Sequence, residues 1–73
     1  MTVIKVNCIG MLCPEPLMIL KNTVRKLNKG DRIEIHSDDP VSLRDFPAFC
    51  KFMNHKIVCL PDNEHPHRFV IEK

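Results

Sequence analysis

Cys13 is the residue whose context most favours chemistry, because the segment Cys13-Pro14-Glu15-Pro16 places a thiol directly before a proline. A residue before proline is kept out of the helical region, as an N-cap requires, and proline suits the first helical position. The sequence therefore predicts that Cys13 caps a helix that begins at Pro14. The positive end of that helix favours a thiolate or persulfide anion, whereas the Glu15 carboxylate opposes it. We expect a nucleophile of moderate reactivity, with a merely capping cysteine as the alternative.

The other three cysteines have structural interpretations. Cys50 shares the apolar face of a predicted helix with Phe46, and Cys59 lies in a predicted strand, so both are expected to pack in the interior. Cys8 lies five positions before Cys13 and is interpreted as a small residue in a turn. A transient disulfide between Cys8 and Cys13 is the alternative.

A metal site is not expected, although the chain has four histidines and four cysteines. No CxxC pair is present, and His65-Pro66-His67 has the spacing of neither a helix nor a zinc finger. Solvated histidines are the simpler interpretation, and no cofactor is predicted.

A basic stripe along the first predicted helix is the candidate partner-docking surface. At 100° per residue, Lys21, Arg25 and Lys29 fall on one face, with Met18 among them. A flexible apolar side chain surrounded by cations suits an acidic protein partner, and a solvated basic face is the alternative. Direct nucleic-acid binding is not expected, because the chain has no Trp or Tyr for base stacking.

The segment Asp38-Asp39-Pro40 is expected to end a strand and begin the second helix. Asp39 before Pro40 resembles an N-cap with proline in the first turn. Asp38 is left as a candidate functional carboxylate, because this turn and Cys13 can lie at the same end of a two-layer fold.

Length and composition limit the class of protein. Seventy-three residues, 44 % hydrophobic and 27 % charged, suit one globular domain over 1–73. The net charge of +2 is too small for binding to nucleic acid through bulk charge. The longest aliphatic run is far shorter than the ~20 residues that span a bilayer. We see no export signal, so a cytoplasmic protein with reduced thiols is expected.

Hydrophobic periodicity predicts a β-α-β-α-β-β order. Two helices on one face of a four-stranded mixed sheet is the simplest closed packing, a two-layer α/β sandwich. Gly30 is expected to adopt a left-handed conformation after the first helix, and Pro47 to kink the second or delay its start. The predicted strands are 2–6, 32–36, 56–60 and 68–72, and the predicted helices are 14–27 and 40–53.

Three segments together resemble the TusA (SirA-like) family of small sulfur carriers. They are Cys13-Pro14-Glu15-Pro16, Asp38-Asp39-Pro40, and the run from Arg44 to His55 with Arg44-Asp45-Phe46-Pro47 at its start. The resemblance covers nearly the whole chain. It departs from the family at Asn7, where an acidic residue is usual, and at Leu12, where arginine is common. The loss of that arginine leaves the helix end to stabilise more of any thiolate.

The resemblance implies a fold like the C-terminal domain of a bacterial translation initiation factor. It also implies that Cys13 accepts sulfane sulfur from a cysteine desulfurase as a persulfide, without a cofactor. The sulfur then passes to a downstream relay complex for 2-thiolation of the wobble uridine in tRNA, or to another route such as molybdenum-cofactor synthesis. The alternatives are a regulatory or RNA-binding module on the same fold, a selenium carrier, and a thiol reductase.

Overall fold

The computed structural model describes residues 2–73 as six elements in the predicted order. They are β1 (Val3–Asn7), α1 (Glu15–Arg25), β2 (Arg32–His36), α2 (Ser42–Met53), β3 (Lys56–Cys59) and β4 (Arg68–Glu72). The second and fourth predicted strands agree with these bounds at both ends, and the first and third differ from them by one residue. The helices differ more, as described below.

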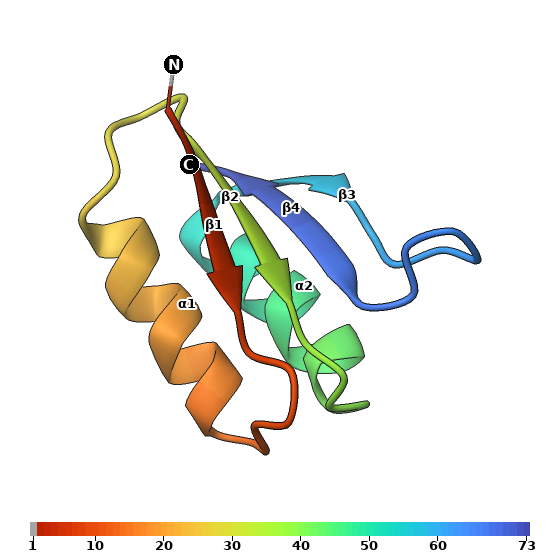
Figure 1. Ribbon diagram of the computed structural model, residues 1–73. Helices are drawn as coiled ribbons and strands as arrows, with labels where there is room; N and C mark the ends of the chain where they lie inside the picture. Colours follow the sequence, from red (N-terminus) through yellow and green to blue (C-terminus); the bar gives the residue numbers. More distant parts are fainter. Residues whose placement is uncertain (1) are drawn as a thin grey trace.

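The strands form one sheet in the order β1-β2-β4-β3, and both helices cover the same face of it (Figure 1). β1 pairs in parallel with β2, whereas β4 is antiparallel to both β2 and β3. The parallel pair requires a crossover, which α1 provides. This confirms the predicted two-layer α/β sandwich with a mixed sheet. Because β1 and β2 run in the same direction, the loops that follow them lie at the same end of the molecule (Figure 1).

The core lies between the sheet and the two helices. Alternate residues of β2 and β4 face it, so that Ile33, Ile35, Phe69 and Ile71 are fully buried. Phe46 of α2 meets Phe69 edge to face, with ring centroids 4.7 Å apart. Leu20 and Val24 of α1 lie in the core together with Leu27 just beyond the helix, and Cys50 lies there as expected.

α1 begins one residue later than predicted, at Glu15. Its N-cap is Pro14, with φ −96°, so Cys13 does not cap the helix. The peptide bond between Cys13 and Pro14 is cis. The helix ends at Arg25, and Gly30 takes the predicted left-handed conformation (φ 94°) in the turn that leads to β2 rather than at the C-cap.

α2 begins at Ser42, so the prediction that Asp39 is its N-cap was wrong. A tight turn precedes the helix, in which the N–H of Ser42 donates to the carbonyl oxygen of Asp39. The helix continues through Pro47 and ends at Met53, where Asn54 adopts a left-handed cap (φ 60°). Met53 is half exposed and not in the core, because it lies in the last turn of the helix.

Candidate functional site

Cys13 is the exposed thiol among the four cysteines, which are all unpaired. It lies in the loop between β1 and α1. Cys8 and Cys50 are buried, and Cys59 is half-buried in β3. Cys8 was expected in a surface turn, but it is a fully buried member of the core because β1 carries it inward under the helices. Its burial does not favour a role as resolving thiol, since a thiol must be reached to exchange.

The backbone of Cys13 is held by Asp39. One carboxylate oxygen of Asp39 accepts the Cys13 N–H at 2.6 Å, and the other accepts the Val41 N–H at 3.1 Å. Asp38 reinforces this attachment, since its carboxylate accepts the Gly10 N–H at 2.9 Å. The loop after β2 therefore holds the loop after β1. Because β1 and β2 are parallel, these two loops lie at the same end of the sheet. Sequence analysis had assigned Asp39 only to helix capping.

The Cys13 side chain faces Asp45 of α2. The thiol donates to Oδ2 of Asp45 with 3.7 Å between sulfur and oxygen, and Oδ1 of Asp45 pairs with Nε of Arg44 at 3.2 Å. Partial desolvation, the charge and hydrogen bond of Asp45 and the charge of Asp39 raise the pKa of the Cys13 thiol, against Arg44, which lowers it. The sequence set the helix end against Glu15, whereas the carboxylates that raise this pKa belong to Asp45 and Asp39. The acidic groups come from α2 and the loop before it, which spacing along the sequence does not reveal.

The motif residues that follow Cys13 have separate roles. Pro16 is buried in the first turn of α1 and anchors the helix start against the core. Glu15 is exposed, and its charge contributes with burial to raising the pKa of Cys8 rather than of Cys13. The hollow beside Cys13, walled by Pro16 and Asp45 among others, encloses essentially no free volume. A group attached to Cys13 therefore projects towards solvent or a partner.

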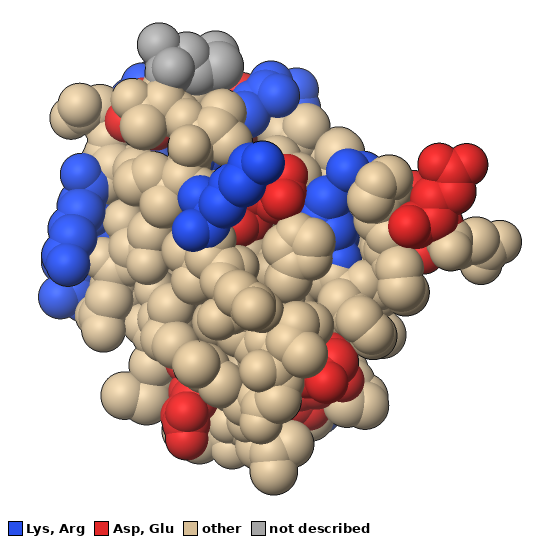
Figure 2. Space-filling view, viewed as in Figure 1, with Lys and Arg blue, Asp and Glu red and all other residues tan. Residues whose placement is uncertain are grey.

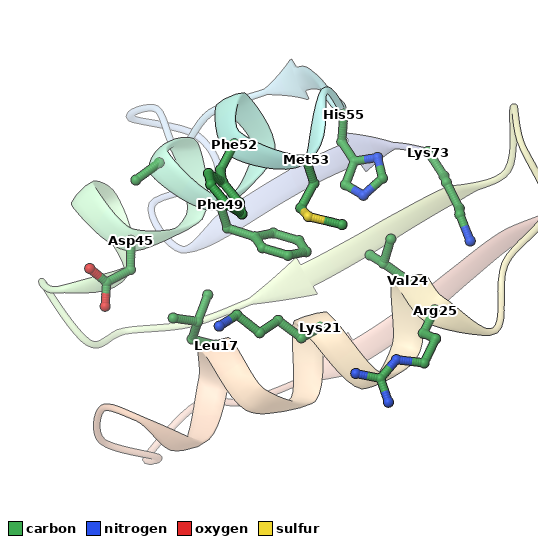
Figure 3. A pocket seen from close by; sticks show the side chains of 11 residues that line it. Leu17, Lys21, Val24, Arg25, Asp45, Phe49, Phe52, Met53, His55 and Lys73 are labelled. Carbon is green, nitrogen blue, oxygen red and sulfur yellow. The ribbon is translucent and has the colours of Figure 1, made fainter.

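A much larger groove runs between α1 and α2 and is named here the interhelical groove (Figure 3). It encloses about 630 Å³. Phe49 and His55 point into it from one side and Lys21 from the other, and its ends lie at Asp45 and Lys73 (Figure 3). Its lining is Leu17, Lys21, Val24, Arg25, Asp45, Ala48, Phe49, Phe52, Met53, His55 and Lys73.

The charge of the groove is positive on the α1 side. Lys21 and Arg25 line it, as does Lys73, and Nζ of Lys21 lies 6.0 Å from the centre of the Phe49 ring. Burial and the charge of Lys73 lower the pKa of His55, which favours the neutral ring. Phe52, which the sequence analysis did not single out, is 87 % exposed at the edge of the groove.

The predicted docking residues are thus only partly brought together. Lys21 and Arg25 line the interhelical groove, whereas Met18 is exposed on α1 outside its lining. Asp38 lies in the loop that holds Gly10 near Cys13. Lys29 lies beyond the C-terminus of α1 and does not continue the helical stripe.

The open face of the sheet has a mixed charge. Basic and acidic side chains are interspersed across it, without a broad basic patch in this view (Figure 2). Lys5 lies opposite Glu34 in the register of β1 and β2, and Arg32 forms an ion pair with Glu72 at 3.0 Å. Such a face lacks the concentrated positive charge with which proteins bind phosphate backbones.

Within residues 2–73, no three His, Cys, Asp or Glu side chains gather as the ligands of a metal ion. Neither helix among these residues has the length and apolar character needed to cross a membrane.

The exposed Cys13 thiol lies beside a helix start with no enclosed volume at its sulfur, an arrangement that suits a group carried on the thiol. A family model described as sulfurtransferase TusA matches residues 4–73. The chain belongs to the TusA family, which confirms the resemblance stated above and gives the group as sulfur.

Proposed function

We propose that this protein accepts sulfane sulfur from a cysteine desulfurase as a persulfide on Cys13 and passes it to a downstream sulfur-relay complex. The final product that we propose is 2-thiouridine at the wobble position of tRNA, made in the cytoplasm, where thiols stay reduced. The observation that supports the carrier step is the exposure of Cys13 at a site with no enclosed volume, in a member of the TusA family. The protein acts as a sulfurtransferase within a relay and not as a stand-alone catalyst.

The transfer is an exchange between sulfur atoms. The Cys13 thiolate attacks the terminal sulfur of the donor persulfide and forms a new S–S bond, while the donor's own S–S bond breaks. The electron pair of that bond leaves on the donor cysteine, which takes up a proton. Delivery repeats the step, with an acceptor thiolate attacking the outer sulfur of the Cys13 persulfide. Neither step requires an external oxidant or reductant.

We propose that the partners dock on the surface that surrounds Cys13. Lys21 and Arg25 supply cations within the interhelical groove, and Met18 supplies an exposed apolar contact beside it. Asp38 lies at the Cys13 end of the same surface. Since the donor and acceptor must both reach one sulfur, they use this surface in turn.

The test is intact-mass analysis after incubation with a cysteine desulfurase, pyridoxal phosphate and cysteine. We expect a gain of ~32 Da that a reductant reverses, since a persulfide adds one sulfur atom. Cys13→Ser should remain unloaded, whereas Cys59→Ser, the matched control in a half-buried thiol, should load normally. Full loading of Cys13→Ser would contradict the proposal. Absence of loading with two active desulfurases would favour the binding-module alternative, and loading of selenium from selenocysteine without loading of sulfur from cysteine would favour a selenium carrier.

A further inference from the structure

Asp45 lies where the interhelical groove meets the Cys13 thiol. It is one of two residues, with Leu17, that line both the groove and the small hollow beside Cys13. Its position in the first turns of α2 is fixed by the packing of Phe46, the next residue, in the core. A partner segment that occupies the groove therefore approaches the Asp45 carboxylate and the sulfur together.

The two carboxylates near Cys13 differ in their freedom. Asp39 is nearly buried, and its two oxygens accept the N–H groups of Cys13 and Val41. Asp45 is more exposed, and its partners are the Cys13 thiol and Arg44, whose side chain is 79 % exposed. A solvent-exposed ion pair of this kind contributes little and is readily exchanged. Asp45 can therefore change partners without disturbing the loop that holds Cys13.

The charged groups around the sulfur come from two segments. The loop before α2 supplies Asp39 and α2 supplies Asp45 and Arg44, and together with partial desolvation they leave the pKa of the thiol raised. Glu15 in the first turn of α1 acts on Cys8 instead. A persulfide anion at the same position would face the same two carboxylates.

We propose that Asp45 stabilises the neutral thiol of Cys13 in the free protein, and that a positively charged group of the docked partner pairs with Asp45 and favours the thiolate. The inference rests on the proposed sulfur-carrier function. On docking, the Cys13 proton passes to solvent, and the thiolate attacks the partner's outer sulfur. The partner's S–S bond breaks, and its electron pair leaves on the partner's cysteine sulfur. That sulfur then takes up a proton. Asp45 in this way restricts exchange to partners that bring a cation to the sulfur.

The first experiment measures the rate at which iodoacetamide alkylates Cys13 as a function of pH, in a Cys59→Ser background. Asp45→Asn keeps the shape of the side chain and removes its charge. We expect it to lower the apparent pKa and to raise the rate at pH 7 by about 3- to 10-fold, since one pKa unit is a tenfold change in thiolate. Glu64→Gln, an equal charge change on an exposed loop, should leave the profile unchanged, and Arg44→Gln should shift it the opposite way. An unchanged profile for Asp45→Asn would overturn the proposal.

The second experiment tests the selection by charge, using two small disulfides as probes. Cystamine carries two positive charges and dithiodiglycolate two negative charges, and each reacts with Cys13 to give a mixed disulfide and a free thiol. We expect the protein to react faster with cystamine, and the ratio of the two rates to fall at least about threefold in Asp45→Asn. An equal ratio in both proteins would overturn the proposal. Neither measurement needs a desulfurase. A negative result here therefore contradicts the role of Asp45 and can be told apart from a negative result in the persulfide-loading test.

Discussion

The carboxylate of Asp39 accepts the backbone N–H of Cys13 at 2.6 Å, across 26 positions of sequence. The same side chain accepts the Val41 N–H, and it is 7 % exposed. A charged group with so little access to water is tolerated because both oxygens accept hydrogen bonds. This single side chain therefore connects the loop of the reactive thiol to the start of α2.

Asp39→Ala should destabilise the protein and loosen the Cys13 loop. Removing the carboxylate leaves the N–H groups of Cys13 and Val41 without their acceptor, at a cost of about 1–3 kcal/mol per buried group. Urea unfolding measures the loss, and amide exchange at Cys13 reports the loop. Asp38→Ala is the control, since it removes one exposed hydrogen bond to Gly10 and should cost well under half as much. Equal losses in the two variants would refute a special role for Asp39.

Phe52→Ala should impair sulfur loading without affecting stability. Phe52 is 87 % exposed, so its removal should change the free energy of unfolding by less than about 0.5 kcal/mol. We expect the exposed ring to anchor the desulfurase, so loading at subsaturating donor should fall roughly tenfold, while iodoacetamide alkylation of Cys13 stays the same. Leu60→Ala removes an apolar side chain that is 51 % exposed in another part of the molecule and should load normally. Normal loading of Phe52→Ala would place the donor elsewhere.

Loading by the desulfurase should slow as salt rises, because Lys21 and Arg25 line the docking groove. The Debye length falls from about 10 Å at 0.1 M salt to about 3 Å at 1 M, which screens an encounter between charged surfaces. Lys21→Gln with Arg25→Gln should flatten this dependence, whereas Lys56→Gln on β3 should not. Stopped-flow or quenched loading between low and high salt gives the slopes. A steep slope that persists in the double variant would exclude these two cations as its source.

Much of the fold was predictable because its signals are local. Alternation in β2 and β4 and the helical period in α1 each require only neighbouring residues, and those elements confirm the predicted order. Phe52 could also have been found by the same arithmetic. It follows Phe46 by six residues, about 240° around the helix, which turns it away from the core.

The environment of Cys13 was not predictable in the same way. Asp39 and Asp45 approach it from 26 and 32 positions away, and only the packing of α2 beside the loop determines which atoms meet. Local reasoning set the helix end against Glu15 and missed the carboxylates of Asp39 and Asp45, whose charges raise the pKa of the thiol. Cys8 was misplaced for the same reason, since its burial depends on the helices that cover β1.

Stability should fall as pH rises from about 9 to 11, and Cys50 should account for much of the fall. Burial raises the pKa of Cys50 from 9.0 to about 11. Between these values the unfolded chain releases the thiol proton while the folded protein keeps it, so alkaline pH favours unfolding. The contribution is complete below pH 9 and lost as the pH passes 11, and two pKa units correspond to roughly 2–3 kcal/mol.

Urea unfolding of the native protein and of Cys50→Ala at pH 8 and at pH 10.5 separates this effect from the packing loss. The variant should be less stable at pH 8, because it leaves a small cavity in the core beside Phe46. Its stability should then decline less between the two pH values than that of the native protein. Cys59→Ala is the control, since its thiol is only half-buried in β3, and it should retain the full decline. If Cys50→Ala declines as steeply as the native chain, the alkaline loss arises from another group, and burial of Cys8, whose pKa is also raised, becomes the next candidate to test by Cys8→Ala.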